Sequence, residues 1–446
     1  MRKSFFHLPL LGLGLLAACG GPSKEEKAEA AATTPADTVA TATTAVKLPE
    51  PYASESVTKR SEVIGWPTGK TPVVPAGFSI SEYAGDFESP RWAYVTPSGD
   101  VLIAEANTVP TNPKKKIAAA LKLDPSKSLR PTSANRITLL RDTNKDGKPD
   151  VRETFLSNLN QPLGMLVLGN YFYVGNTDGV WRYPYQSGQT RITAKGEKIL
   201  DLPAGGYNNH WTRNLLAGPD GKKIYVSVGS GSNVAEHGIE NEKRRANILE
   251  INPDGSGEKI YAAGLRNPVG MDWAPSTGKL WTAVNERDEL GDDLVPDYLT
   301  SVQEGAFYGW PYSYFGQHED PRRKGERPDL VKKSVVPEVP LGPHTASLGL
   351  AIYDGLAFPT KYRGGAFIGQ HGSWNRSSFT GYKVVFVPFQ NGKPAGPMED
   401  FVTGFVADEG KKQVYGRPVG ITEMPDGSLL VADDAAGKVW RVVASS

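Results

Sequence analysis

Arginine and histidine side chains gather in five short stretches that lie far apart in the chain, at residues 89–91, 208–213, 264–270, 370–376 and 416–420. Guanidinium groups pair with carboxylates through two parallel hydrogen bonds and stay charged at any working pH. Imidazole accepts a proton near neutral pH. The pattern therefore predicts a central site for a small ligand with several negative charges. Its candidate residues are Arg91, His210, Arg213, Arg266, Asn267, His371, Arg376 and Arg417.

Distant residues share a site only if the fold gathers them, and a weak internal repeat indicates how. Six times, a turn rich in Gly, Pro or Asp leads into an apolar strand that ends on small, polar or acidic residues. The copies span residues 97–107, 168–178, 219–233, 275–288, 362–375 and 425–434. This pattern predicts an all-β fold, a six-bladed β-propeller whose loop ends surround one axis. Seven blades and a pair of sandwiches stay open as alternatives.

Two long insertions interrupt the repeats, at residues 107–136 and 312–348. Loops of this length in a compact domain are usually functional or mobile. The propeller is therefore expected to carry long inserted loops.

One loop has the spacing of a calcium-binding loop. Asp142, Asn144, Asp146, Asp150 and Glu153 place oxygen donors at positions 1, 3, 5, 9 and 12, with a glycine at position 6. The flanking residues read as strands, which argues against a helix-loop-helix sensor. Similar loops also close β-hairpins through Asx turns alone, so both interpretations stay open. A bound ion would be structural.

The N-terminus is predicted to be separate from the fold. Arg2 and Lys3 precede an apolar run that fits a secretory signal of residues 1–18, and residues 16–19 resemble a bacterial lipobox. Cys19, the single cysteine, is then the lipidated residue. Residues 19–55 are expected to be a flexible tether, and residues 56–446 the propeller. The alternative is an ordinary cleaved signal with an incidental cysteine.

Charge excludes one class of partner. Fifty basic and forty-nine acidic residues in a chain of 446 leave a formal charge of +1. No electrostatic case for nucleic-acid binding exists. We expect a lipid-anchored protein of the bacterial cell envelope that meets the membrane only through its acyl chains.

Several motifs together resemble one family. They are the His-x-x-Arg stretch at 210–213, Gly-Leu-Arg-Asn-Pro at 264–268, the acidic loop at 285–293, Tyr-Gly-Trp-Pro at 308–311 and Gly-Arg-Pro-Val at 416–419. The chain resembles the soluble quinoprotein sugar dehydrogenases, and especially their sorbosone dehydrogenase-like branch. The resemblance implies a six-bladed propeller that holds pyrroloquinoline quinone and Ca²⁺ on its axis. It also implies oxidation of an aldose or sugar aldehyde, with an unknown electron acceptor.

The resemblance implies roles for individual residues. His210 would be the general base, Arg266 and Asn267 would face the quinone oxygens, and Arg417 would pair with a carboxylate. The backbone carbonyls of Glu286 and Arg287 would bind the Ca²⁺ of the cofactor, although the family has other residue types at these two positions.

One departure bears directly on the base. Where glucose-oxidising members carry an Asp that orients the histidine, this chain has Ser230. His210 would therefore need another orienting partner. Two alternatives stay open at this stage: a Ca²⁺-dependent lactonase on the same fold and a non-enzymatic ligand-binding propeller.

Overall fold

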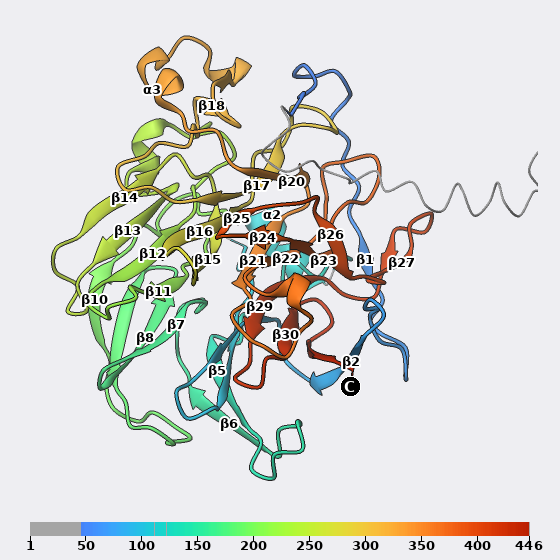
Figure 1. The fold of residues 1–446 in the computed structure, drawn as a ribbon. Coiled ribbons are helices and arrows are strands. Elements are labelled where there is room, and N and C mark those ends of the chain that lie inside the picture. Colours follow the sequence, from blue (N-terminus) through green and yellow to red (C-terminus); the bar gives the residue numbers. More distant parts are fainter. Residues whose placement is uncertain (1–45, 111, 122, 446) are drawn as a thin grey trace, which may run out of the picture. The chain divides into compact units, whose positions relative to one another are not determined.

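The computed structural model describes residues 46–110, 112–121 and 123–445 (Figure 1). The predicted signal segment, Cys19 and residues 20–45 of the predicted tether lie outside the described residues. Residues 46–55, the end of that tether, contact the folded domain: Val46 and Leu48 pack on an apolar cluster, and Tyr52 N donates to Leu290 O at 2.8 Å. In the described part of the chain, no helix combines the length and apolar character that a membrane span needs.

The described residues form six antiparallel four-stranded sheets, of which the first three in chain order lie between residues 90 and 263. The first contains β3 (Pro90–Val95), β4 (Val101–Glu105), β5 (Arg136–Arg141) and β6 (Val151–Leu156). The second contains β7 (Met165–Leu168), β8 (Tyr171–Asn176), β9 (Gly179–Pro184) and β10 (Glu197–Asp201). The third contains β11 (Leu215–Ala217), β12 (Ile224–Val228), β13 (Asn247–Ile251) and β14 (Lys259–Ala263).

The other three sheets follow in chain order. The fourth contains β15 (Pro268–Ala274), β16 (Lys279–Val284), β17 (Pro296–Ser301) and β20 (Val339–Pro343). The fifth contains β21 (Ser347–Ile352), β22 (Ala366–Gln370), β23 (Lys383–Val387) and β26 (Glu399–Val402). The sixth contains β29 (Pro418–Glu423), β30 (Leu429–Asp433), β31 (Lys438–Ala444) and, from the start of the chain, β2 (Phe78–Ala84).

The prediction of an all-β fold is confirmed, and each predicted repeat contains the second strand of one sheet: β4, β8, β12, β16, β22 and β30. These strands are recognisable from sequence because they are mainly apolar and follow tight turns. Pairing of β2 with β31 joins the two ends of the folded chain in one sheet.

Neighbouring sheets meet through their first strands. Hydrogen bonds of 2.7–2.9 Å between these strands or their flanking residues join neighbouring sheets. In order around the sheets, the donor and acceptor atoms are Val167 N and Tyr94 Oη, Gly164 N and Arg213 O, Asn214 Nδ2 and Val269 O, Ile352 N and Asp272 Oδ2, and Thr422 Oγ1 and Ala93 O. Between the fifth and sixth sheets the approach is closer still. A Cβ on Gly349 of β21 would lie 2.0 Å from the carbonyl oxygen of Val419, so only glycine fits there.

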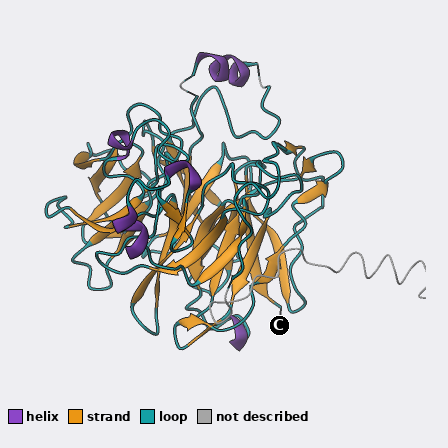
Figure 2. Ribbon diagram, turned by 90° about the horizontal axis from the view of Figure 1, so that it is seen from above, coloured by secondary structure: helices purple, strands orange, loops and turns teal. Residues whose placement is uncertain are grey.

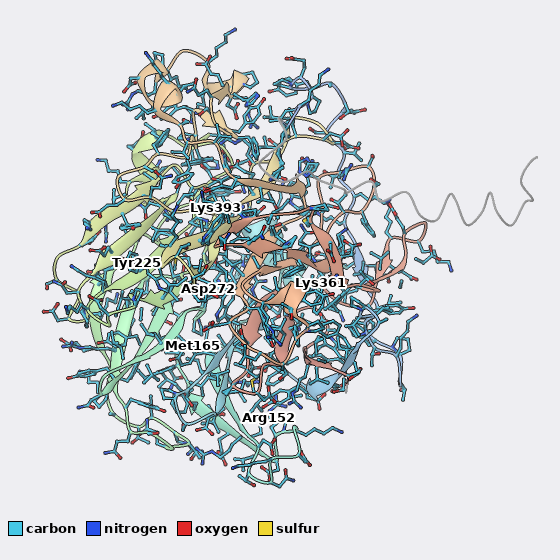
Figure 3. The ribbon with its side chains drawn as sticks, viewed as in Figure 1. Arg152, Met165, Tyr225, Asp272, Lys361 and Lys393 are labelled. Carbon is cyan, nitrogen blue, oxygen red and sulfur yellow. The ribbon has the colours of Figure 1, made fainter. Side chains whose placement is uncertain are left out.

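Apolar side chains fill the space between adjacent sheets. Leu166 and Tyr173 of the second sheet, for example, pack with Val226 and Leu249 of the third. Met165 and Tyr225 of two other such clusters are labelled in Figure 3. Burial of this kind contributes about 25 cal/mol per Å² of apolar surface, so the sheet-to-sheet packing stabilises the arrangement.

Helices are few and short and lie outside the six sheets (Figure 2). The first insertion contains α2 (Pro113–Ala120), and the second contains β18 (Ser313–Tyr314), β19 (His318–Glu319), η2 (Pro321–Arg323) and α3 (Pro328–Lys333). The remaining short elements are β1 (Glu62–Val63), β27 (Val406–Asp408), β28 (Gln413–Val414), β24 (Phe389–Gln390), β25 (Lys393–Pro394), η1 (Ile239–Glu242) and η3 (Thr360–Tyr362). The predicted insertion 312–348 was too long: its residues 339–343 form β20, which two prolines and a glycine disguise in the sequence.

Candidate active site

One cavity of about 410 Å³ lies among the inner ends of several sheets. Six of the eight predicted ligand-binding or catalytic residues line it: Arg91, His210, Arg266, Asn267, His371 and Arg417. They come from the starts of β3, β15 and β29, from the loop before β11 and from the end of β22. The structure thus brings together residues that are more than 300 positions apart in the chain, such as Arg91 and Arg417.

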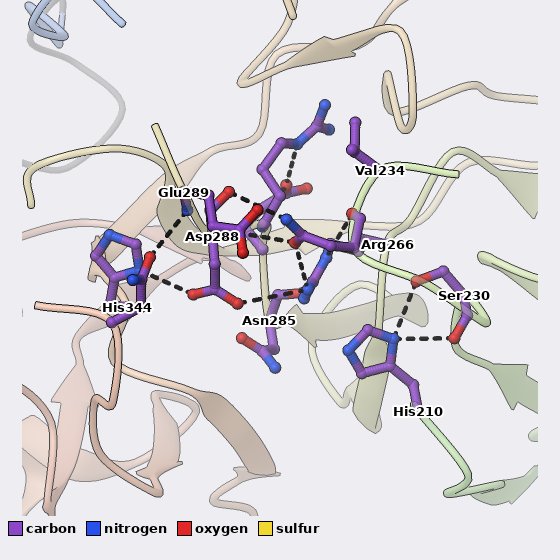
Figure 4. A network of polar contacts seen from close by, with 12 residues as sticks. His210, Ser230, Val234, Arg266, Asn285, Asp288, Glu289 and His344 are labelled. Carbon is purple, nitrogen blue, oxygen red and sulfur yellow. Dashed lines mark hydrogen bonds and ion pairs between the residues drawn. The ribbon is translucent and has the colours of Figure 1, made fainter. Parts of the chain in front are cut away.

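His210 is oriented by the backbone and side chain of Ser230 (Figure 4). Its Nδ1 lies 2.9 Å from both the carbonyl oxygen and the hydroxyl oxygen of Ser230. The hydroxyl in turn donates to Ser232 O at 2.6 Å, so it accepts from the imidazole. Because a carbonyl can only accept, Nδ1 carries the proton and Nε2 carries the lone pair. Ser230 itself is therefore the orienting partner that His210 needs.

The charge state of His210 follows from its surroundings. The residue is 8% exposed, and burial, followed by the charge of Arg266, holds the pKa of its imidazole well below the usual value. His210 is therefore neutral near pH 7. In the described structure no hydrogen bond is formed by its Nε2, which leaves that atom available to accept a proton from a ligand.

Arg266 is anchored rather than mobile. Its guanidinium is 2% exposed and donates to Asn233 O, Asn233 Oδ1 and Asn285 O at 2.9–3.2 Å. Asp288 Oδ2 lies 3.6 Å away. These contacts preorganise the charge of Arg266 beside His210 (Figure 4).

His344 lines the same cavity in a different charge state. Its Nδ1 lies 3.0 Å from Asp288 Oδ1 and its Nε2 lies 2.8 Å from Gly291 O. Both neighbours are acceptors, so both ring nitrogens carry protons. Burial opposes this charge, but the hydrogen bond to Asp288 raises the pKa of His344. His344 is therefore a cation and cannot act as a base.

His371, Asp434 and Arg91 form a third group on the cavity wall. His371 Nε2 lies 2.8 Å from Asp434 Oδ1, and Arg91 forms an ion pair with the other oxygen of Asp434. Burial and the charge of Arg417 lower the pKa of His371 to about 4, so its ring is neutral at pH 7 and donates through Nε2. Arg417 itself donates to His371 O, Gly372 O and Ser128 Oγ at 2.9–3.0 Å.

Two predicted ligand-binding residues do not line the cavity. Arg213 is fully buried and donates to the carbonyl oxygens of Pro203, His210 and Thr212, so it holds the segment that carries His210. Arg376 forms an ion pair with Asp293 at 2.9 Å. Sequence position alone could not separate these arginines from Arg266 and Arg417, because strand direction decides which side chain faces the axis.

The predicted metal-binding positions lie apart from the cavity wall. Glu286 and Arg287 are 2% and 0% exposed, and the Arg287 guanidinium binds Glu286, Asp320 and the carbonyls of Pro311 and Ser313. Their neighbours Asn285 and Asp288 reach the cavity instead. The side chain of Arg287 cannot serve as a ligand, so any role in ion binding falls to backbone carbonyls.

The loop between β5 and β6 contains Asp142, Asn144, Asp146 and Asp150, and Glu153 follows on β6. The predicted flanking strands are confirmed. Asp142 accepts from the backbone N–H groups of Asp146 and Gly147, and Asp150 accepts from Thr143 N. Within the described ranges, no group of three or more His, Cys, Asp or Glu residues is arranged to hold a metal ion.

Several residues that line the cavity were not among the candidates predicted from sequence. Asn233, Asp288 and Asp434 end the third, fourth and sixth repeats, so the polar residues that terminate the repeats were the available signal. Arg60 and Lys127 also line the cavity. They lie outside every repeat, and nothing in their local sequence indicates that they reach the axis.

Comparison with known proteins agrees with this geometry. A family model described as glucose/sorbosone dehydrogenase matches residues 174–374, and a model described as TrAA12-like matches residues 319–445. An uncharacterised protein of Borreliella burgdorferi is 30% identical over 300 residues, which cover 65% of this chain and 77% of that protein. A pyrroloquinoline quinone-dependent pyranose dehydrogenase of Coprinopsis cinerea is 24% identical over 347 residues. That match covers 64% of this chain and 46% of the enzyme, so the chain corresponds to about half of it.

A solved structure shows the same fold. The holo form of the quinone-binding domain of the Coprinopsis cinerea pyranose dehydrogenase superposes with a TM-score of 0.67 at 19% identity, covering 86% of this chain and all of that domain. The chain belongs to the glucose/sorbosone dehydrogenase family. Relatives with a named activity include the pyrroloquinoline quinone-dependent pyranose dehydrogenase of Coprinopsis cinerea and a quinoprotein glucose dehydrogenase of Acinetobacter calcoaceticus.

Proposed function

We propose that this protein is a pyrroloquinoline quinone-dependent dehydrogenase that oxidises an aldose or a sugar aldehyde. The six four-stranded sheets would be the six blades of a propeller. The observation that carries the proposal is the neutral His210, whose free Nε2 stands beside anchored arginines in a single cavity. The relatives support the cofactor and the substrate class.

The donor set of the cavity fits such a cofactor. A cavity of about 410 Å³ is in the range of small-molecule sites. Arg91, Arg266 and Arg417 supply the positive charge that a tricarboxylate requires. Asn267 Oδ1 and Arg91 Nε are buried at this wall without a hydrogen-bond partner among the described residues, and such atoms mark where ligand contacts are missing. Trp211 and Trp374 also line the cavity, and the guanidinium groups of Arg91 and Arg60 lie 5.4 and 5.2 Å from their ring centroids.

When bound, the quinone supplies the electrophile that accepts a hydride from the substrate carbon. Residues of the protein carry out the proton transfer and stabilise the developing charge. His210 Nε2 takes the proton from the substrate hydroxyl as the hydride leaves, and its Nδ1–H stays fixed on Ser230. Arg266, held by Asn233 and Asn285, places positive charge where negative charge develops.

We further propose that Ca²⁺ supports the site through the backbone of residues 286–287. The lipidation of Cys19 and a place in the bacterial cell envelope also remain proposals, based on the basic, apolar and lipobox-like residues of the N-terminus. The electron acceptor would be reached in that compartment.

A reconstitution assay tests the function. Purified protein would receive pyrroloquinoline quinone and Ca²⁺ and be assayed with a panel of aldoses and an artificial electron acceptor. Wild type should reduce the dye, and His210→Ala should lower kcat by about 10²- to 10⁴-fold, which is what a lost general base costs. Lactone hydrolysis without quinone would instead identify a lactonase. Absence of both activities would point to a binding protein.

A further inference from the structure

Two positively charged side chains reach the cavity from segments outside the six sheets. Arg60 belongs to the segment before β1, and Lys127 belongs to the first insertion. The guanidinium of Arg60 lies 5.2 Å from the ring centroid of Trp374, another cavity residue. Within the described part of the chain, neither Arg60 nor Lys127 forms an ion pair with a carboxylate.

Both segments are held firmly although they lie outside the sheets. Lys59 N donates to Trp374 O at 2.8 Å, and Val63 N donates to Pro125 O at 2.9 Å, which links the two segments to each other. Asp124 accepts from Ser126 N at 3.2 Å and from Leu129 N at 2.8 Å, so it fixes the turn that carries Lys127. The two cations are therefore presented by ordered backbone.

Arg60 and Lys127 are both exposed, and Asp433 is the carboxylate whose charge acts on Lys127 without forming an ion pair. Partial burial and the nearby Arg130 lower the pKa of Lys127. Arg130 Nε and Ser61 Oγ are buried without a hydrogen-bond partner among the described residues, and Ser61 lines the cavity. A buried donor without a partner, such as the Ser61 hydroxyl, is unfavourable unless a ligand completes it. An anion that accepts a hydrogen bond from Ser61 could at the same time pair with the two cations, which have no ion-pair partner among the described residues.

We propose that Arg60 and Lys127, with Ser61, form a carboxylate-binding subsite at the wall of the cavity. The carboxylate belongs either to the quinone cofactor or to an acidic sugar. The first source rests on the proposed function, whereas the second does not. In either case the segment 46–66 and the first insertion select the ligand, while the loop before β11 supplies the base His210.

Calorimetric titration of the full-length protein, purified without cofactor and supplied with Ca²⁺, tests the subsite. The probes are two matched pairs: pyrroloquinoline quinone with its trimethyl ester, and galacturonate with galactose. The variant Arg60→Gln/Lys127→Gln removes both charges at similar size. Arg60→Lys/Lys127→Arg keeps them, and Lys114→Gln removes an exposed charge of the same insertion outside the cavity. Thermal unfolding checks that each variant is folded.

The charge-removing variant should bind at least one of the two carboxylate probes tenfold or more weakly than wild type, while its affinity for the uncharged counterpart of that probe should not change. The charge-keeping variant and Lys114→Gln should bind as wild type does. If only the binding of the quinone is weakened, the carboxylate belongs to the cofactor. If only the binding of galacturonate is weakened, it belongs to an acidic sugar. If wild type binds galacturonate through this subsite but does not bind the quinone, the subsite stands and the proposed dehydrogenase fails. Equal binding of both carboxylates by wild type and variant, or no binding of either by wild type, overturns the proposal.

Discussion

Three histidines of the cavity share one type of side chain but have different protonation states. His210 faces a carbonyl and a hydroxyl and is neutral, His344 lies between two acceptors and is a cation, and His371 is neutral beside Asp434. Among them, His210 combines an unprotonated Nε2 with the neighbouring charge of Arg266. The roles of these residues are thus set by their neighbours and not by residue type.

The contact between His210 and Ser230 makes a prediction at this scale. Ser230→Asp should raise the pKa of His210, because a carboxylate beside Nδ1–H stabilises the imidazolium. Ser230→Ala should have a smaller effect, since the backbone carbonyl that accepts from Nδ1 remains. NMR titration of the six histidines, with His210→Ala to assign the signal, measures both shifts. An unchanged or lowered pKa in Ser230→Asp would contradict the assigned tautomer.

At the scale of elements, the inner strands approach so closely that some positions accept no side chain. Gly349 of β21 faces Val419 of β29, and Gly270 of β15 faces Leu350 of β21, where a Cβ would lie 2.5 Å from the backbone nitrogen. Close packing of these strands fixes the spacing of the residues at their ends. The glycines therefore position the site without touching it.

Gly349→Ala should destabilise the protein by about 1–3 kcal/mol, because the added methyl group forces the fifth and sixth sheets apart. Gly205→Ala is the matched control, since a Cβ there meets nothing within 4 Å. It should be neutral or slightly stabilising. Urea unfolding of the three proteins measures the difference. Equal midpoints for Gly349→Ala and wild type would show that this approach is not tight in solution.

At the scale of the whole molecule, the start of the folded chain closes on its end. Strand β2 pairs with β31, and the indole of Trp66 donates to Asp433 Oδ2 at 2.8 Å. Asp433 also accepts from Arg417 N at 2.8 Å, so this closure adjoins the cavity wall. The segment that precedes it, residues 46–66, supplies Arg60 and leads back toward the proposed lipid anchor.

The anchor is testable on the intact protein. After expression in a bacterial host, wild type should enter the detergent phase of a Triton X-114 partition, because acyl chains on Cys19 supply its membrane affinity. Cys19→Ser should remain in the aqueous phase with unchanged thermal stability. Partition of both proteins into the aqueous phase would favour an ordinary cleaved signal instead.

Particular strands and side chains show which parts of the structure could be predicted from the sequence alone. The second strand of each sheet was predictable because a short apolar run follows a turn, with four consecutive apolar residues in β4 and in β30. Strand β20 was not, because Pro340 and Pro343 conceal a strand that pairs only at the edge of its sheet. Among the candidate residues, Arg266 and Arg417 reach the cavity whereas Arg213 and Arg376 do not.

The sequence by itself determined the β-rich repeat, the types of residue that end each repeat and the resemblance to quinone-dependent sugar dehydrogenases. These properties are local, because a turn or an apolar strand depends on residues that are close together in the sequence. Only the tertiary structure decided which arginines face the cavity, that Ser230 orients His210, and that Arg60 and Lys127 meet at the same wall. Those facts depend on side-chain direction and on contacts between segments far apart in the chain, which no local pattern encodes.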